Sequence, residues 1–155
     1  MEQSSKTLTF VVPAYNMETY LERCVESLLS ATDNSDIEVL IVDDGSSDGT
    51  PELADMYERR WPGNVRAIHQ VNKGHGGAVN TGIANATGMY VKVVDADDWV
   101  DMPSIDTLMG TLRVQRVATD PVDMIVTNYV YDKVGKRVKH TVNFRHAMAA
   151  NTVLG

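Results

Sequence analysis

The sequence predicts an α/β fold with one mostly parallel sheet flanked by helices. Short apolar runs typical of buried strands alternate along the chain with segments of helical periodicity. A strand and the helix after it together take about 25–30 residues, which is the spacing of βαβ crossovers. The 155 residues, 43% of them hydrophobic, suit a single domain with a hydrophobic core.

The first half of the chain is predicted to contain three strands and two helices. The apolar runs LTFVV, IEVLIV and VRAIHQ predict strands over residues 8–12, 37–42 and 65–70, and Pro13 is expected to stop the first of them. A helix over 18–30 places one group of side chains on a common face: Tyr20, Leu21, Cys24, Val25, Leu28 and Leu29. Thr50 is expected to be the N-cap of the next helix, with Pro51 at its first position and its end near Arg60.

The second half is predicted to contain two further strands, two helices and a hairpin. A helix of small residues is expected over 76–86, a buried strand over 89–94, a helix over 103–117 and a fifth strand over 122–131. Lys92 interrupts the fourth strand, and we expect it near the exposed start of that strand. Residues 130–142 predict a solvated basic hairpin that turns near Val134-Gly135, with contact to an acceptor phosphate or a membrane surface as the alternative.

Composition narrows the classes of partner. The net charge is −7, from 14 basic and 21 acidic residues, which argues against nucleic acid as the main partner. Cys24 is the single cysteine, so the chain has no intrachain disulfide and no cysteine-based zinc site. No apolar run reaches the ~18 residues of a membrane span, and MEQSSK lacks the apolar core of a signal peptide. We therefore expect a cytoplasmic location.

Polar or glycine-rich residues follow four of the predicted strands, over 13–18, 43–48, 71–77 and 95–98. Parallel sheets bind ligands beyond the carboxyl ends of their strands, so these segments are the candidate site. In the first, Tyr15 can stack on a flat ring and Asn16 can cap the next helix. A plain strand–turn–helix connection is the alternative.

The second segment, IVDDGSSDGT, ends a nonpolar strand on Asp43 and Asp44. A carboxylate at this position can accept a hydrogen bond from a base N–H or a ribose hydroxyl. Gly45 permits a tight turn, and the residues after it can satisfy turn or helix-start amides. The alternative is that every one of these residues serves the turn.

The third segment, NKGHGGAVNTG, has glycines that let the backbone approach a ligand closely at the predicted start of a helix. Lys73 can face a phosphate, and His75 can contact either the ligand or the backbone. The segment is not a P-loop, because G-x-x-x-x-G-K-[ST] is absent, and GHGGAV does not fit the dinucleotide pattern G-x-G-x-x-G.

The fourth segment, VKVVDADDWV, ends a strand on three carboxylates. Strand alternation places Asp95 and Asp97 on one side and Ala96 on the other. Two carboxylates on one side suit a hard divalent cation such as Mg²⁺ or Mn²⁺. Asp98 is either a further ligand or the start of the turn before Trp99. A solvated acidic turn without a metal is the alternative.

In their order and spacing, these segments resemble the nucleotide-sugar-binding half of the family 2 glycosyltransferases. The resemblance is carried by VVPAYNMETYLERCVESLL, IEVLIVDDGSSDGT, NKGHGGAVNTGIANATGMYVKVVDADDWV and Pro103. It implies the GT-A fold, a Rossmann-like fold of nucleotide-diphospho-sugar transferases. It also implies that the single domain 1–155 comprises a nucleotide and metal half, about 8–103, and the incomplete start of an acceptor half, 104–155.

The resemblance implies a role for each matching position. Pro13, Ala14 and Tyr15 would flank the uracil and ribose of a UDP-sugar. Asp44 would bind the base, and Glu18 belongs to the same strand exit. Lys73 and Gly74 fall where the family contacts the nucleotide. Asp95 and Ala96 would lie near the ribose, and Asp97 would bind Mg²⁺ or Mn²⁺.

The implied reaction is transfer of a sugar, with inversion, from a nucleotide-sugar to a hydroxyl of a glycan or lipid-linked acceptor in polysaccharide biosynthesis. A carboxylate base in an acidic motif well beyond the D-x-D would deprotonate that hydroxyl. The acids after Asp98 do not lie in such a motif: Asp101, Asp106, Asp120, Asp123 and Asp132. We therefore expect the base beyond Gly155 and a truncated chain that binds donor and metal but transfers sugar poorly.

Three alternatives remain open at this point. The chain can be a non-catalytic nucleotide-binding module that needs a partner or a missing C-terminal part. It can be a sugar-nucleotide pyrophosphorylase, although PAYNME stands where those enzymes carry a glycine-rich loop with an arginine. The full-length protein can also associate with the inner face of the membrane.

Overall fold

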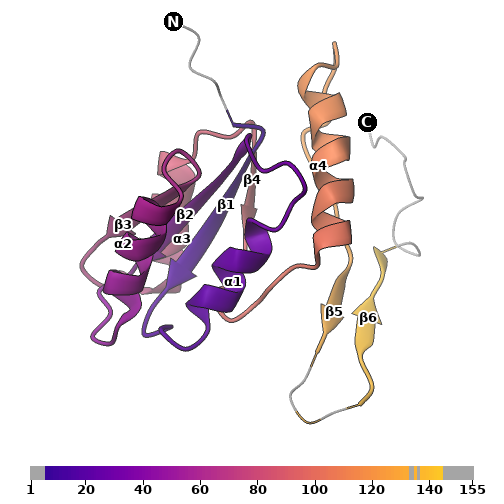
Figure 1. The fold of residues 1–155 in the computed structure, drawn as a ribbon. Coiled ribbons are helices and arrows are strands. Elements are labelled where there is room, and N and C mark those ends of the chain that lie inside the picture. Colours follow the sequence, from indigo (N-terminus) through magenta and orange to yellow (C-terminus); the bar gives the residue numbers. More distant parts are fainter. Residues whose placement is uncertain (1–5, 133–134, 136, 145–155) are drawn as a thin grey trace, which may run out of the picture. The chain divides into compact units, whose positions relative to one another are not determined.

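The computed structural model describes residues 6–132, 135 and 137–144, which belong to two compact units, 1–117 and 118–155 (Figure 1). The first unit contains four strands and four helices: β1 Leu8–Ala14, α1 Leu21–Leu28, β2 Ile37–Asp43, α2 Thr50–Arg60, β3 Val65–His69, α3 Gly74–Asn85, β4 Tyr90–Val93 and α4 Met102–Arg116. The second unit contains β5 Tyr129–Tyr131 and β6 His140–Val142. The predicted α/β class is confirmed.

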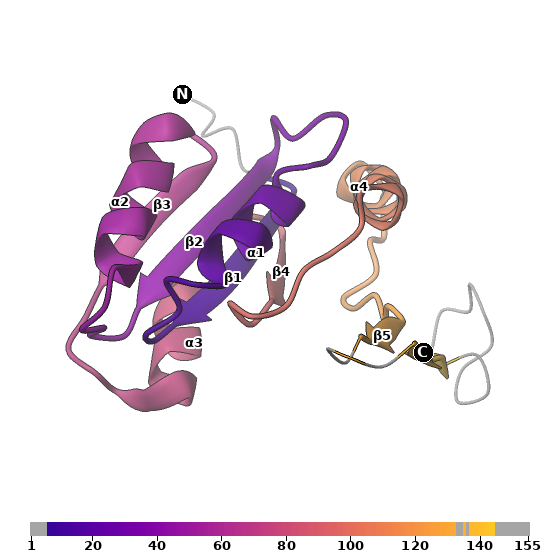
Figure 2. The same cartoon turned by 60° about the horizontal axis from the view of Figure 1, so that its bottom comes forward.

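The first unit is built on a parallel sheet with the strand order β3-β2-β1-β4. The chain moves outward from β1 to β3 and then returns to the other side of β1 to form β4. Right-handed crossovers therefore place α1 and α2 on one face of the sheet and α3 on the other (Figure 2). The order reverses at β1, so the crevice between the ends of β1 and β4 is the expected ligand site.

The two central strands form the middle of the core. All seven residues of β1 and all seven of β2 are buried, as expected of parallel strands that are covered on both faces. The helix α1 buries Leu21, Cys24, Val25 and Leu28, which confirms most of its predicted face, whereas Tyr20 is 55% exposed. Helix α3 lies so close to β1 that a Cβ at Gly82 would overlap the Val11 side chain.

Pro13 does not stop the first strand, contrary to the sequence prediction. β1 continues to Ala14, and Pro13 pairs in register with Val42. The Val11 carbonyl accepts from Val94 N–H, and the Ala14 carbonyl accepts from Asp44 N–H. Since bonding direction alternates along a strand, Pro13 faces the β4 side, where the paired residues end at Val11. Its missing N–H is therefore tolerated.

Thr50 is the first residue of α2 rather than its N-cap, which is Gly49. The Thr50 hydroxyl instead accepts a hydrogen bond from Met17 N–H at 2.8 Å. Asp48 takes over the expected capping role, because its Oδ1 accepts from Thr50 N–H at 3.0 Å. The start of α2 is thus joined to the loop that follows β1.

β4 is an edge strand in the described sheet, which corrects the expectation of a buried strand. Val91 and Val93 are 42% and 37% exposed, and burial begins only afterwards, at Val94 and Ala96. Lys92 is half-buried in the middle of this strand rather than at its start.

The fifth strand predicted over 122–131 is wrong over 122–128, which has no regular secondary structure. Met124 is 75% exposed there, so its apolar pattern is not used to form a core strand. Only Tyr129–Tyr131 is a strand, and it pairs antiparallel with β6, which agrees with the predicted hairpin. Gly135, at φ 79°, lies in the expected turn, whereas Val134 is outside the described residues.

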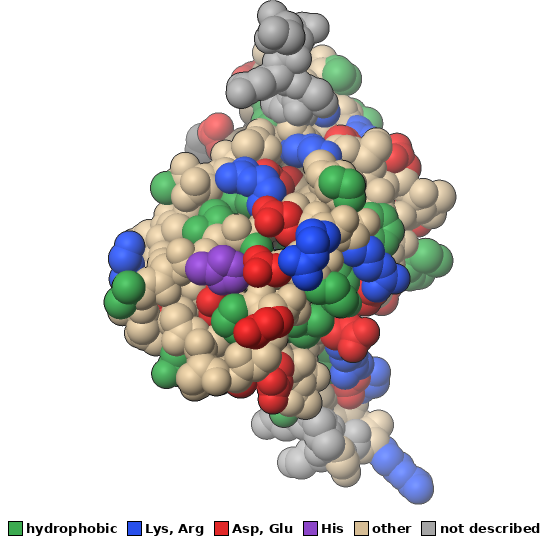
Figure 3. Space-filling model, turned by 60° about the vertical axis from the view of Figure 1, so that its left-hand side comes forward, with side chains coloured by type: hydrophobic (Ala, Val, Ile, Leu, Met, Phe, Trp, Pro, Cys, Tyr) green, Lys and Arg blue, Asp and Glu red, His purple; other side chains and the backbone are tan. Residues whose placement is uncertain are grey.

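Charges on the surface are partly paired. Acidic and basic side chains lie next to one another on the face shown in Figure 3. Arg60 pairs with Glu26 on the surface at 3.1 Å. The partly exposed Arg66 pairs with the buried Glu38 at 2.9 Å. Within the described ranges, none of the helices has the length and apolar character needed to cross a membrane.

We predict that Gly82→Ala destabilises the fold and that Gly110→Ala does not. A methyl group at Gly82 would overlap Val11, and overpacking of this kind costs about 1–3 kcal/mol. Gly110 lies within α4 with open space around its Cβ position, so alanine there should stabilise the helix by about 1 kcal/mol. Urea unfolding of both variants measures the difference, and equal effects at the two sites would contradict it.

Candidate donor and metal site

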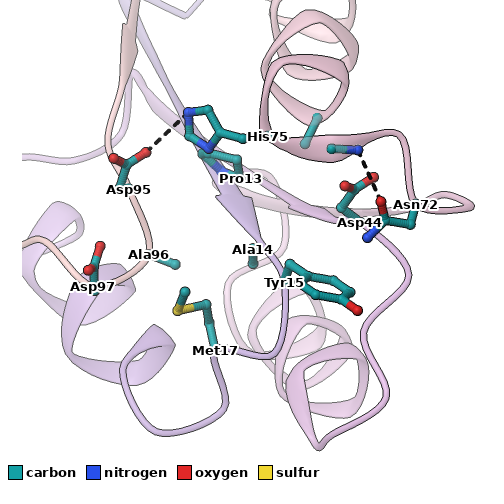
Figure 4. Close-up of a pocket in the computed structure, with 12 residues that line it drawn as sticks. Pro13, Ala14, Tyr15, Met17, Asp44, Asn72, His75, Asp95, Ala96 and Asp97 are labelled. Atoms are coloured by element: carbon teal, nitrogen blue, oxygen red, sulfur yellow. Dashed lines mark hydrogen bonds and ion pairs between the residues drawn. The ribbon is translucent and has the colours of Figure 1, made fainter.

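A cavity of about 290 Å³ lies at the carboxyl ends of the strands, where the strand order reverses (Figure 4). Its walls come from the ends of β1, β2 and β4 and from the start of α3. The lining residues are Pro13, Ala14, Tyr15, Met17, Asp44, Asn72, Gly74, His75, Ala78, Asp95, Ala96 and Asp97. The cavity therefore joins all four polar segments that the sequence singled out.

The loop after β1 is fixed by hydrogen bonds to the loop after β2. Asn16 adopts a left-handed conformation with φ 55°. Its N–H donates to Ser46 Oγ at 2.9 Å, and its Oδ1 accepts from Ser47 N–H at 2.8 Å. The sequence predicted that Asn16 can cap the next helix. The structure shows instead that Asn16 joins two loops. These contacts hold Tyr15 and Met17, its two neighbours, at the cavity.

Asp44 is the most enclosed carboxylate of the cavity, at 3% exposure. Its Oδ1 accepts from Gln70 Nε2 at 2.7 Å and from Lys73 N–H at 2.8 Å. Burial acts to raise the pKa of Asp44, but these donors, Gly74 N–H and the Lys73 charge outweigh it and leave the pKa below its ordinary value. Asp44 is therefore a fixed, ionised hydrogen-bond acceptor at the cavity wall.

Asp43 has a different role from its neighbour. Its Oδ1 accepts from Ser46 N–H at 3.0 Å, and its Oδ2 contacts His69 Nδ1 at 3.0 Å. The other ring nitrogen of His69 lies 3.0 Å from Asp55 Oδ1. Asp43 thus holds the β2–α2 turn and the end of β3 together, outside the residues that line the cavity.

Three carboxylates gather at the end of β4. Asp95, Asp97 and Asp98 each have a ligand atom within 4.8 Å of the others, and all three are exposed, whereas Ala96 is 2% exposed. Burial, followed by the charges of Asp97 and Asp95, raises the pKa of Asp98. An oxygen-rich donor set with unrelieved repulsion fits a hard divalent cation such as Mg²⁺ or Mn²⁺.

Cys24 lies beneath this acidic cluster, as the predicted core residue of α1. Its thiol donates to the Asp95 carbonyl at 3.7 Å. Burial and the charges of Asp98, Asp97 and Asp95 raise its pKa to about 12. The thiol therefore stays neutral and serves packing rather than chemistry.

His75 lies beside Asp95 of the acidic cluster. Its Nε2 is 3.7 Å from Asp95 Oδ1, so the ring reaches the carboxylate from the first turn of α3 (Figure 4). The sequence left ligand contact and backbone contact open for His75. Its position in the cavity wall favours ligand contact.

The cavity gathers most residues predicted for the nucleotide and metal, but Glu18 and Lys73 are not among those that line it. Glu18 Oε2 accepts from Gly49 N–H at 2.6 Å, and Lys73 contributes its backbone N–H to Asp44. Met17 and Asn72 line the cavity, although no sequence pattern predicted a role for them. Their positions depend on loop conformation, and the only available signal was their proximity to Tyr15 and Lys73.

The acids after Asp98 have mainly structural contacts. Asp101 caps α4 through Ser104 N–H at 3.1 Å, and Asp106 accepts from Thr32 N–H at 2.8 Å. Asp132 pairs with Lys139 at 2.8 Å. None of these three carboxylates is among the residues that line the cavity.

Comparison with known sequences identifies the family. The model of glycosyl transferase family 2 matches residues 9–152. The chain belongs to this family. It is 40% identical over 131 residues to the glycosyltransferase GlyG of Streptococcus pneumoniae, which covers 83% of the chain and 41% of GlyG. It is 34% identical over 131 residues to EpsH of Bacillus subtilis, of which it spans 36%. The chain thus spans well under half the length of these relatives.

Solved structures confirm the GT-A glycosyltransferase fold. The match to Staphylococcus aureus TarS 1-349 in complex with UDP-GlcNAc has a TM-score of 0.63 at 26% identity, and covers 71% of this chain and 32% of TarS. A mannosyltransferase from Pyrobaculum calidifontis, in complex with GDP-Man and Mn²⁺, matches with a TM-score of 0.61 at 28% identity, over 74% of this chain and 33% of that one. Structures of this fold therefore bind donors with different bases.

We predict that His69 titrates above the ordinary histidine value of about 6.5. Its hydrogen bonds to Asp43 and then Asp55 raise its pKa. The charged ring therefore stabilises the fold below pH ~6.5, and this contribution is lost as the pH rises through the folded-state pKa. Titration followed by NMR should show the raised midpoint in the wild type and a lower one in Asp55→Asn. An unchanged midpoint in that variant would refute the assignment.

Proposed function

We propose that this chain forms the donor-binding part of a metal-assisted, inverting glycosyltransferase that uses a nucleotide-sugar, with UDP-sugars as the first candidates. The observation that carries the proposal is that one cavity, at the reversal of strand order, is lined by residues predicted to bind the base and by the residue predicted to bind the metal. Family membership supports sugar transfer as the chemistry.

The proposed orientation of the nucleotide follows from the two ends of the cavity. At one end, Tyr15 offers a half-exposed ring for stacking, and Asp44 offers an acceptor for a base N–H. At the other end lie the acidic cluster, which includes Asp95, and Ala96, and the ribose and diphosphate would occupy that side. The backbone at Gly74 borders the space between them.

Asp97 is the residue we assign to the metal, with Asp95 and Asp98 as neighbouring carboxylates within reach of the same ion. Mg²⁺ or Mn²⁺ bound there would act as a Lewis acid and neutralise the charge that develops on the leaving diphosphate. The chain's own contribution is the turn after β4, in which Asp98 N–H donates to the Asp95 carbonyl at 2.9 Å and which keeps the three carboxylates together. Ala96, buried between them, fixes that turn against the core.

A second candidate function is donor binding without deprotonation of the acceptor. The structural contacts of Asp101, Asp106 and Asp132 favour it, because they leave these acids poorly suited to act as the catalytic base. In this case the described residues would hold the leaving group, and the base would come from residues outside them. The acceptor, a glycan or lipid-linked hydroxyl, would be bound by the complete enzyme.

We predict that Asp97→Asn abolishes the gain in UDP affinity that Mn²⁺ provides. The amide keeps the size of the side chain but removes the charge that binds the cation. Calorimetry with UDP, with and without Mn²⁺, measures the gain in the wild type and the variant. A preserved gain in Asp97→Asn would contradict the metal assignment.

The matched control is Asp120→Asn, which removes one exposed carboxylate from the second unit. It changes the net charge equally and should keep the Mn²⁺-dependent gain. Parallel titrations with GDP test the choice of base, since a preference for GDP would replace UDP as the proposed donor nucleotide. Binding of neither nucleotide by the wild type would refute the proposed function itself.

A further inference from the structure

We propose that Gln70 and Thr81 are positioning residues that hold Asp44 as a hydrogen-bond acceptor and thereby set the choice of nucleobase. The site would select bases that present a ring N–H, such as uracil, against bases that present a ring-nitrogen acceptor, such as cytosine. The inference rests on the proposed donor-nucleotide function and adds a selectivity mechanism to it.

A chain of hydrogen bonds leads from α3 to the cavity. Thr81 Oγ1 donates to Gln70 Oε1 at 2.6 Å, and Gln70 Nε2 donates to Asp44 Oδ1 at 2.7 Å. Thr81 lies within α3, and Gln70 directly follows β3. Asp44 is thus oriented by residues that come from two different elements.

The donor and acceptor of each hydrogen bond from Thr81 through Gln70 to Asp44 follow from the chemistry of the three side chains. An ionised carboxylate only accepts, so the Gln70 amide must turn its NH₂ group toward Asp44. Its oxygen then faces Thr81, whose hydroxyl must donate. The opposite amide orientation would place the Gln70 oxygen against the Asp44 carboxylate, so that two acceptors would meet, and the Asp44 charge therefore excludes it. Thr81 therefore stabilises the orientation of Gln70, and Gln70 stabilises that of Asp44.

Burial makes this arrangement necessary. Asp44 is 3% exposed, and its desolvation favours the neutral form of the carboxyl group. The Gln70 amide is the largest of the contributions that lower its pKa against that effect. Without Gln70, Asp44 would lose a side-chain donor that keeps it ionised, and its carboxylate would be oriented by the backbone N–H groups of Lys73 and Gly74.

A fixed acceptor distinguishes two bases of nearly equal size. Uracil presents an N–H at ring position 3, which can donate to Asp44. Cytosine presents a lone pair at the same position, and this would face the carboxylate without a hydrogen. Leaving a buried acceptor without its donor is costly, so the difference between the bases should be large. Shape alone would distinguish them poorly.

The test compares affinities for UDP and CDP, measured by calorimetry in the presence of Mn²⁺. We expect the wild type to prefer UDP and Gln70→Leu to lose about tenfold of that preference, as for one hydrogen bond to a charged group. Thr81→Val, which keeps the shape of the side chain, should lose a smaller part. Thr81→Ser keeps the hydroxyl and should therefore retain the wild-type ratio of UDP to CDP affinity.

Thr111→Val is the matched control, because the Thr111 hydroxyl donates to the Thr107 carbonyl within α4. It should leave the UDP to CDP ratio unchanged. A purely structural role for Gln70 would weaken both nucleotides by the same factor and leave that ratio intact, which would overturn the inference. So would equal binding of UDP and CDP by the wild type. Binding of no nucleotide by the wild type would instead refute the proposed function.

Discussion

The parallel register of β1 on β2 is the constraint on which the rest of the site depends. Ala14 pairs with Asp43, and Asp44 N–H donates to the Ala14 carbonyl at 2.9 Å. The strands β1 and β2 therefore end at the same level of the sheet. Tyr15 and Asp44 are therefore neighbours at one edge. A shift by one residue would move Ala14 out of register with Asp43 and would thereby move Tyr15 away from Asp44.

The buried carboxylates at the end of β2 then organise the loops around them. Asp43 and Asp44 are each 3% exposed, so each needs donors from nearby segments. Asp43 contacts Ser46 N–H and His69, while Asp44 accepts from Gln70 and Lys73 N–H. The same requirement that stabilises the fold thus brings the loops after β2 and β3 into fixed positions beside the cavity.

The sequence predicted those features that follow from a local pattern of residues, and it missed those that depend on contacts between distant segments. The continuous apolar runs of β1 and β2 were sufficient, because burial on both faces is a local pattern in the chain. The segment 122–128 has a similar pattern but is exposed at Met124, since a strand also needs a partner. Asp95 and Asp97 line the cavity as expected, but from the turn after β4 rather than from a continuing strand. Met17 depends on the left-handed conformation of Asn16, which the sequence does not determine.

Asp44 and the three acids after β4 differ in how their negative charge is stabilised. The Asp44 charge is stabilised by the Gln70 amide, by backbone N–H groups and by the Lys73 charge, so Asp44 can serve as an acceptor of defined direction. At the end of β4, burial and the charges of Asp97 and Asp95 instead raise the pKa of Asp98. Burial and the charges of all three acids likewise raise the pKa of the Cys24 thiol. A charge left unrelieved in this way is best balanced by a cation. One end of the cavity therefore suits the recognition of a neutral base, and the other suits the binding of a metal with its diphosphate.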